Sequence, residues 1–476
     1  MTDQHVVEAD LAIIGAGSGG LSVAAGAAQM GAKVVLIEKG KMGGDCLNYG
    51  CVPSKALIAA AEAAETVRTS GKFGVNGHEP DITFAKVNGH VHDVIAGIAP
   101  HDSVERFEGL GVQVIQVAGQ FISPTEIQAG GQRIKARRFV IATGSSAFIP
   151  PIPGLDDVPY LTNETIFSLT DAPDHLIIVG GGPIGIEMAQ AHRRLGVEVT
   201  LVEGGTIMGK DDLDAVAVVR KHLIDEGVVL REGAKVESVV PSGNGLSVLV
   251  SQDGHSAPVD GSHLLLAVGR RPNVAGLGLE AAGIGHTARG ITIDARLRTT
   301  NKKVFAIGDV AGGYQFTHMA GYHGGIVIKN ALFNLPAKVD ERAVPWVTYT
   351  DPELAQVGLS EAQAAEQGVL VRASTFDFAG NDRAQAERAT EGFVKAVVGK
   401  RGKILGSTIV GRHAGELILP WVLAVQKGLK IADMASLIAP YPTLGEASKR
   451  AAGAYYTPSL FSDRTKAIVG LMQRLP

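Results

Sequence analysis

Residues 9–20, Ala-Asp-Leu-Ala-Ile-Ile-Gly-Ala-Gly-Ser-Gly-Gly, decide the fold of this chain. The mostly apolar first half of this stretch predicts a buried parallel strand, and the alanine-rich segment after it predicts a helix. Gly15, Gly17 and Gly20 are spaced to make a tight turn that admits a pyrophosphate to the N-terminus of that helix. The strand after the helix ends at Glu38, an acid placed to accept a hydrogen bond from a ribose hydroxyl. The pattern predicts a Rossmann-like dinucleotide-binding fold.

A second copy of the same pattern begins with the apolar run at residues 175–179. It continues with Gly180, Gly182 and Gly185, and its second strand ends at Glu203. The acid follows the first glycine by 23 residues in both copies, from 15 to 38 and from 180 to 203. Two such fingerprints, each framed by strands and a helix, predict that the chain binds two dinucleotides.

The chain has two cysteines, Cys46 and Cys51, and both lie in the segment GGDCLNYGCVPSK at residues 43–55. Their spacing allows a short loop to close a disulfide. A helix is expected to open at Pro53, so that Cys51 lies beside its N-terminus, where a thiolate is favoured. We interpret the pair as redox machinery, because a structural disulfide is unusual in a protein without signs of export.

The order of these motifs assigns the two nucleotides. The cysteine segment follows the first fingerprint directly, so the first nucleotide is expected to exchange electrons with sulfur, which suits a flavin (FAD). The second fold is then expected to hold a nicotinamide. Glu203 would repel a 2′-phosphate, and residues 204–209 contain no Arg, with Lys210 the nearby cation. NADH is therefore favoured over NADPH.

Bulk properties exclude other classes of function. A formal net charge of −4 offers no basic field for nucleic acid. No uninterrupted apolar stretch approaches the roughly 18 residues of a membrane span. The acidic start, with Asp3, Glu8 and Asp10, does not have the layout of a signal peptide. A cytoplasmic protein of two to four domains is expected from these features and the length of 476 residues.

Together these residues resemble the class I pyridine nucleotide–disulfide oxidoreductases, a family that includes dihydrolipoamide dehydrogenase, glutathione reductase and mercuric reductase. The resemblance rests on the cysteine segment, the two fingerprints, ATGS at 142–145, AVGRRPN at 267–273 and TNKKVFAIGD at 300–309. It implies an α/β fold with two Rossmann-like domains and a C-terminal α+β dimerisation domain, assembled as a homodimer. The implied ranges are 1–150 (FAD, first part), 151–272 (NAD), 273–340 (FAD, second part) and 341–476 (dimerisation).

The resemblance also implies roles for single residues. Cys51 would be the sulfur next to the flavin and Cys46 the interchange thiol that faces the acceptor. Lys55 would lie near flavin N5 and pair with Glu187 of the nicotinamide domain. Asp309 would bind the ribityl chain. The other implied contacts are Gly44, Gly119, Thr143, Gly144 and Thr317 for the flavin and Gly269 for the nicotinamide.

The chain departs from the family at residues 439–446, APYPTLGE. Disulfide-reducing members carry a His there, followed by a Glu and contributed across the dimer, and this chain has Tyr441 and Glu446. A phenol with a pKa near 10 is deprotonated only about one part in 10³ at pH 7, whereas imidazole titrates near 6.5. General acid–base catalysis contributes about 10²–10⁴ in rate, so dithiol–disulfide exchange is expected to be impaired.

Mercuric reductases carry a Tyr in a similar place, and a soft metal bound by two thiolates needs no proton for a leaving thiol. They usually end with a further cysteine pair, which a chain with two cysteines lacks. The leading hypothesis is a mercuric-reductase-like flavoprotein that reduces a small-molecule or soft-metal acceptor, with no resident metal site. The alternatives are dihydrolipoamide dehydrogenase, or a flavin oxidase or quinone reductase that bypasses the disulfide.

Overall fold

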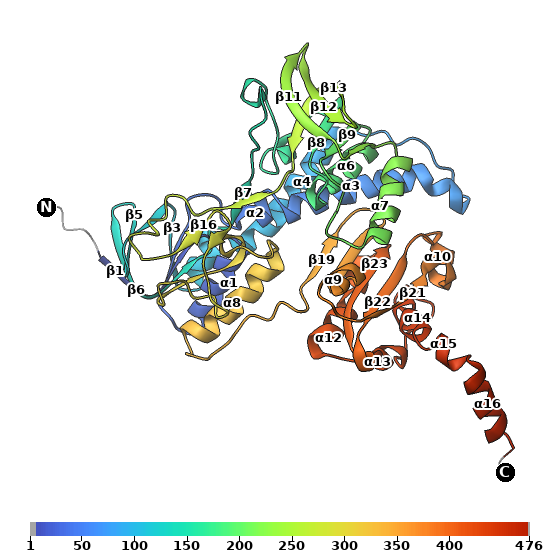
Figure 1. The fold of residues 1–476 in the computed structure, drawn as a ribbon. Coiled ribbons are helices and arrows are strands. Elements are labelled where there is room, and N and C mark those ends of the chain that lie inside the picture. Colours follow the sequence, from blue (N-terminus) through green and yellow to red (C-terminus); the bar gives the residue numbers. More distant parts are fainter. Residues whose placement is uncertain (1–5, 475–476) are drawn as a thin grey trace.

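The computed structural model describes residues 6–474, and within them the first layer is a seven-stranded sheet (Figure 1). Its order is β3-β2-β1-β6-β5-β4, and β18 pairs with β6. The bounds of these strands are β1 Val6–Ile14, β2 Val34–Ile37, β3 Val112–Ile115, β4 Gly119–Ser123, β5 Glu126–Ala129, β6 Gln132–Ile141 and β18 Val304–Ala306. β1, β2, β3, β6 and β18 run parallel, so their carboxyl ends meet at one edge. Asp3, on which the expected absence of a signal peptide partly rests, lies outside the described residues.

Alternate residues of β1 pack on opposite faces of this sheet. Leu11 and Ile13 join a core with α1 and α8, while Ala12 and Ile14 join the core on the other face. This alternation follows from the two-residue period of a strand. The helices of this part are α1 Ser18–Gln29, α2 Gly44–Asn48, α3 Cys51–Thr69, α4 Phe84–Ile98, α5 Val104–Gly109 and α8 Thr317–Ala331.

The cysteine helix begins earlier than expected. Its first residue is Cys51, not Pro53, and the first backbone bond runs from the Ser54 N–H to the Gly50 carbonyl. Pro53 is tolerated at the third helical position because the first N–H groups of a helix have no partner inside it. Cys46 lies in the separate short helix α2.

The second parallel sheet has the order β10-β9-β8-β14 and carries a three-stranded antiparallel sheet, β11-β12-β13, beside it. The bounds are β8 His175–Val179, α6 Pro183–Arg194, β9 Glu198–Glu203, α7 Leu213–Asp225, β10 Val229–Glu232, β11 Lys235–Ser242, β12 Gly245–Gln252, β13 His255–Gly261 and β14 His263–Leu266. The chain returns to the first sheet through β15 Arg270–Pro272, which pairs with β7 Ser145–Ala147, and through β16 His286–Thr287 and β17 Gly290–Ile291.

The C-terminal part is an antiparallel sheet of order β19-β20-β23-β22-β21 covered by helices around the fully buried Trp421. Its strands are β19 Pro345–Thr348, β20 Glu353–Gly358, β21 Arg372–Asp377, β22 Phe393–Val398 and β23 Ile404–Gly411. Its helices are α9 Glu361–Glu366, α10 Asp382–Glu387, α11 Ala414–Leu417, α12 Leu419–Lys427, α13 Ile431–Ala435, α14 Glu446–Ala454, α15 Thr457–Leu460 and α16 Asp463–Met472. α16 projects away from this part (Figure 1).

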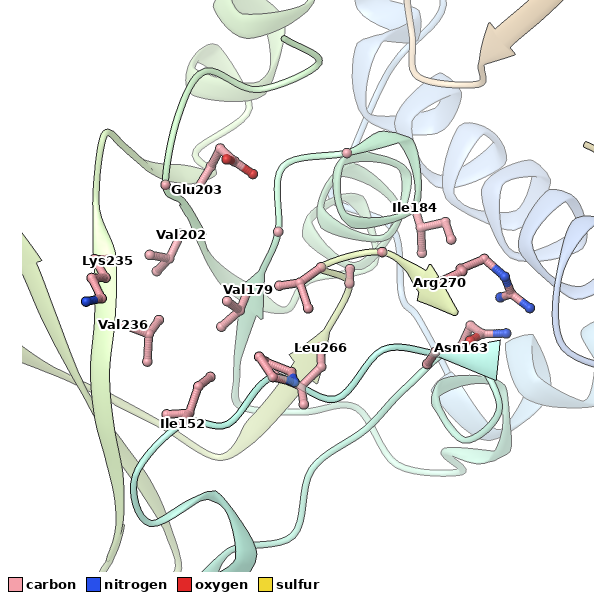
Figure 2. Close-up of a pocket in the computed structure, with 18 of the residues that line it drawn as sticks. Ile152, Asn163, Val179, Ile184, Val202, Glu203, Lys235, Val236, Leu266 and Arg270 are labelled. Carbon is pink, nitrogen blue, oxygen red and sulfur yellow. The ribbon is translucent and has the colours of Figure 1, made fainter. Parts of the chain in front are cut away.

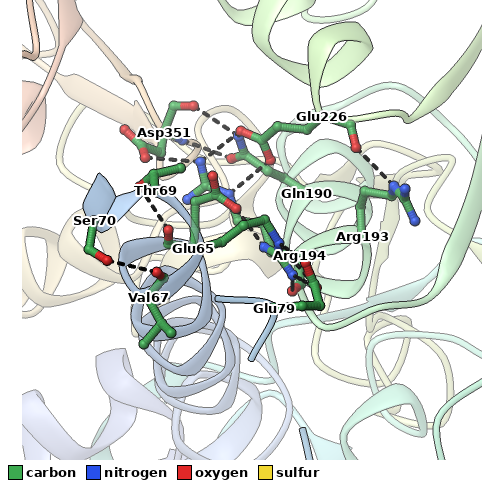
Figure 3. Close-up of polar contacts among 11 residues, drawn as sticks. Glu65, Val67, Thr69, Ser70, Glu79, Gln190, Arg193, Arg194, Glu226 and Asp351 are labelled. Carbon is green, nitrogen blue, oxygen red and sulfur yellow. Dashed lines mark hydrogen bonds and ion pairs between the residues drawn. The ribbon is translucent and has the colours of Figure 1, made fainter. Parts of the chain in front are cut away.

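Paired charges join the C-terminal part to the part of the chain that contains the second parallel sheet. Arg194 of α6, with 6% of its side chain exposed, donates to Glu226 at 2.7 Å and to Asp351 at 2.9 Å (Figure 3). Lys395 of β22 donates to Asp212, which caps α7, at 2.8 Å. These pairs satisfy charges that burial would otherwise penalise.

The expected fold class, two Rossmann-like folds and a C-terminal α+β part, is confirmed. The domain boundaries at residues 150, 272 and 340 stay predictions. No helix within residues 6–474 is long and apolar enough to cross a membrane.

Candidate functional site

The two glycine turns have nearly identical geometry. A Cβ built on Gly20 would lie 1.8 Å from the carbonyl oxygen of Gly15, and one built on Gly185 would lie 1.9 Å from that of Gly180. Gly15 and Gly180 have φ of 107° and 112°, which only glycine adopts readily. No side chain fits at these positions, so the backbone is free to approach a ligand closely in both turns.

The acid that closes each motif folds back over its glycine turn. Oε2 of Glu38 accepts from the Ala16 N–H at 2.6 Å, and Oε2 of Glu203 accepts from the Gly181 N–H at 2.6 Å. The other oxygens accept from backbone N–H groups two residues further on, at 2.7 and 2.8 Å. Each carboxylate therefore lies at the mouth of its turn, where a ribose would be held.

The helices after the turns are open to anions. α1 is preceded by Gly17 and α6 by Gly182, and within residues 6–474 no side chain caps either helix. Unpaired N–H groups and the helix dipole make such an end a phosphate site. In the first turn Gly44 adds a narrow wall, since a Cβ there would lie 2.7 Å from the Gly17 Cα. The residues present fit a dinucleotide at each turn.

A pocket of about 620 Å³ extends from the second glycine turn (Figure 2). Its volume falls in the usual range for ligand pockets, roughly 300–1,000 Å³. Gly269 lines it, with Glu203 and Lys235 toward one end and Arg270 beside Asn163 at the other. Lys210, the cation considered from the sequence, is not among the described residues that line it.

The two cysteines are free thiols with opposite acidities. A hydrogen bond from Cys46 is the largest cause that lowers the pKa of Cys51 to about 6, and the Thr317 hydroxyl, 3.3 Å from the Cys51 Sγ, and the charge of Lys55 add to it. The pKa of Cys46 is raised, mainly because its thiol donates to Cys51 and because it is buried. Cys51 is therefore the thiolate at neutral pH and Cys46 the thiol.

Lys55 and Glu187 form the expected pair. The Lys55 Nζ lies 2.7 Å from Oε2 of Glu187, whose side chain is 6% exposed. The second oxygen, Oε1, accepts from the Tyr349 N–H at 3.0 Å, and the Lys55 ammonium lies 4.3 Å from the centre of the Tyr349 ring. One carboxylate of α6 thus holds α3 and the segment after β19 together.

Asp309 lies at the carboxyl end of β18, where burial raises its pKa. It accepts from the Ser145 hydroxyl at 2.6 Å, and Ser145 accepts in turn from Nε of Arg270 at 2.7 Å. Thr143 and Gly144 precede Ser145 and are tied to the backbone and side chain of Asn273.

Gly119 begins β4. A Cβ built on it would lie 3.0 Å from Ile37, which packs it against the end of β2.

Tyr441 and Glu446 are in the C-terminal part. Their hydrogen-bond partners there are Asp382 and Arg450, not Cys46 or Cys51. The Tyr441 hydroxyl donates to Asp382 at 3.0 Å, and this carboxylate raises the pKa of the phenol further. Glu446 accepts from Arg450, one turn along α14, at 3.0 Å. The side chain of Tyr441 is 69% exposed, so it is available to a second subunit.

Comparisons with known proteins agree with this geometry. Residues 9–324 match the family model "Pyridine nucleotide-disulphide oxidoreductase", and residues 344–452 match its dimerisation domain. The chain belongs to this family. It is 36% identical to a mercuric reductase of Bacillus cereus over 95% of this chain and 72% of that protein. It is also 36% identical to a dihydrolipoyl dehydrogenase of Geobacillus stearothermophilus over 94% and 96% of the two chains.

Among solved structures, the flavoprotein disulfide reductase RclA of Escherichia coli in a Cu(II) complex matches with a TM-score of 0.83 and 29% identity, covering 92% of this chain and 98% of that one. Members of the family depend on FAD and use pyridine nucleotides, and the dimerisation domain suggests a homodimer. This pyridine nucleotide–disulfide oxidoreductase has residues that fit both groups. Its described residues include no cluster of three or more His, Cys, Asp or Glu side chains that could hold a metal ion.

Several residues at the oxidoreductase site were not singled out from its sequence. Asn163, Tyr349 and Lys235 carry no local motif, and only the folded chain brings them to the pocket or the cysteine helix. Asp45 lies in the cysteine segment and Arg270 in AVGRRPN, but neither motif predicts a role for them. An acid next to a cysteine was the one available signal.

Proposed function

We propose that this chain is an FAD-dependent, NADH-preferring oxidoreductase that passes electrons through Cys46 and Cys51 to a thiol-reactive acceptor, for which a soft metal ion is the leading candidate. The observation that carries the proposal is the placement of the two sulfurs. Cys51 begins α3 with its Sγ 3.3 Å from the Thr317 hydroxyl, and Cys46 lies in the separate short helix α2. This placement supports a division of labour in which Cys51 faces the flavin and Cys46 faces the acceptor.

The steps balance in electrons and protons. NADH supplies two electrons, which bound flavin would transfer to sulfur. The disulfide between Cys46 and Cys51 is thereby opened to a thiol and a thiolate. The dithiol then gives two electrons to the acceptor, re-forms the disulfide and releases its proton. Lys55, held by Glu187, adds a positive charge that stabilises the Cys51 thiolate.

The surroundings of Tyr441 support an acceptor that needs no proton from the protein. The phenol is committed to Asp382 and its pKa is raised, so it is a poor base at neutral pH. A soft metal ion bound by two thiolates leaves without a thiol to protonate. A mercuric reductase among the relatives, and a Cu(II) complex of the neighbour RclA, are in keeping with this class of acceptor.

Dihydrolipoamide dehydrogenase is the second candidate. The similarity to the Geobacillus enzyme extends over nearly the whole of both chains and favours it. Tyr441 disfavours it, because dithiol exchange at pH 7 needs a base that titrates near neutrality.

The NADH preference rests on Glu203. Its carboxylate at the mouth of the second turn would repel a 2′-phosphate. Lys235 lines the same pocket and works in the opposite direction, so the preference should be measured as a ratio of dissociation constants for NADH and NADPH.

An anaerobic NADH titration tests the proposal. A long-wavelength charge-transfer band before flavin bleaching is expected in the wild type, and its loss is expected in Cys51→Ser. Cys46→Ser should keep the flavin half-reaction and lose turnover with Hg(II) or Cu(II). If Cys46→Ser turns over metal, lipoamide or quinone as fast as the wild type, the disulfide is bypassed and an oxidase or quinone reductase takes the place of the proposal.

A further inference from the structure

Asp45 directly precedes Cys46, and two residues that line the pocket at the second glycine turn bind its side chain. Its Oδ1 accepts from the Asn163 amide at 2.9 Å and lies 3.1 Å from Nη2 of Arg270. The Asn163 amide also donates to the Tyr49 carbonyl at 3.2 Å. Both donors line the pocket of the second dinucleotide and lie side by side in Figure 2. The short helix α2 that carries Cys46 is therefore fastened to the rim of that pocket.

Arg270 is itself fixed in place. Nε and Nη2 donate to the hydroxyl and carbonyl of Ser145 at 2.7 and 2.8 Å, and the side chain is only 13% exposed. Ser145 donates in turn to Asp309. A guanidinium bound at two atoms is a rigid, permanently charged group, suited to hold a carboxylate in one position.

We propose that Arg270 is a positioning residue for the cysteine pair, which anchors Asp45 and screens its negative charge from Cys46 and Cys51. The inference deepens the proposed function, on which it rests for the role of the two sulfurs. It assigns Arg270 a task at the disulfide in addition to its place in the wall of the nicotinamide pocket.

Charges around Cys51 make the proposal measurable. The groups that face it are Cys46 and Asp45 from α2, Lys55 from its own helix, Thr317 from α8 and Tyr349 from the C-terminal part. Among these the Asp45 carboxylate raises the pKa of Cys51 and opposes Lys55. The effect of Asp45 must grow when its counter-charge is removed and vanish when its own charge is removed.

Substitutions of the two partners in the Arg270–Asp45 contact should therefore shift the pKa of Cys51 in opposite directions. Arg270→Gln is expected to raise the pH midpoint of Cys51 alkylation, and Asp45→Asn to lower it, each by about half a pH unit or more. Arg271→Gln is the matched control, because the neighbouring Arg271 is exposed and its guanidinium stacks on the ring of Phe148. It should leave the midpoint unchanged.

The assay is iodoacetamide labelling of the dithiothreitol-reduced, flavin-loaded protein between pH 4.5 and 9, with peptide mass spectrometry to separate Cys46 from Cys51. It needs no NADH and no acceptor, so it reads the inference even if the proposed acceptor is wrong. General loosening of the fold would shift the alkylation midpoints of both variants in the same direction. Shifts of the same sign, or unshifted midpoints in both variants, would overturn the inference. If Arg270→Gln does not fold, Asp45→Asn alone decides, and an unshifted or raised midpoint refutes it.

Discussion

Tyr441→His should convert this oxidoreductase toward dithiol–disulfide exchange. The side chain is 69% exposed, so an imidazole is accommodated without repacking. The wild-type phenol, with a pKa above 10 because of Asp382, is ionised in less than about one molecule in 10³ at pH 7, whereas most of an exposed imidazole is the free base. The available base rises by about 10³, and the weaker basicity of imidazole reduces the expected gain in rate to about 10²-fold.

The assay is lipoamide reduction by NADH at pH 7, with Hg(II) reduction measured in parallel. Tyr441→Phe is the control and should leave both rates unchanged. Because Arg450 occupies one oxygen of Glu446 at 3.0 Å, adding Arg450→Ala should free that carboxylate to orient the new imidazole and increase the gain. The reasoning is wrong if Tyr441→Phe lowers lipoamide turnover tenfold, or if the folded, dimeric Tyr441→His variant gains nothing.

Three further outcomes follow from the site. Thr317→Val removes a hydrogen bond to the Cys51 thiolate and should raise the pKa of that thiol from about 6 by about one unit. Since the thiolate exists above this pKa and is lost below it, the onset of Cys51 alkylation should move to higher pH. Glu203→Gln should narrow the preference for NADH over NADPH by about tenfold in titrations of both coenzymes, and an unchanged ratio would remove Glu203 as its cause. Gly185→Ala places a Cβ 1.9 Å from the Gly180 oxygen, so calorimetry should find NADH binding lost while flavin absorbance shows FAD retained; normal NADH affinity would contradict the close packing of that turn.

The parts of the site that sequence could predict are those encoded by short-range geometry. The turn at Gly15 and its acid at Glu38 are joined by one strand–helix–strand unit, so their spacing suffices to place them together. Asn163 meets Asp45 across 118 positions, and Tyr349 meets Glu187 across 162. Such contacts depend on how whole sheets pack, for which a single sequence carries no local pattern.

Smaller discrepancies have equally local causes. Pro53 was expected to open the helix, but an unpaired N–H is tolerated through the whole first turn, so the helix begins at Cys51. The sequence offers Lys210 as the cation near the coenzyme ribose, whereas the residue that lines the pocket is Lys235 at the start of β11.

The carboxylate of Glu187 sets a limit on how this chain can be rebuilt. It belongs to α6, yet its two oxygens bond to α3 and to the backbone after β19, so a chimaera that imports a whole nicotinamide domain must preserve this residue and its depth in the junction. Coenzyme preference, by contrast, is expected to depend on Glu203 at the end of β9 and on Lys235. Redesign for a different coenzyme is therefore best confined to the segment from β9 to β11, leaving α6 as it stands.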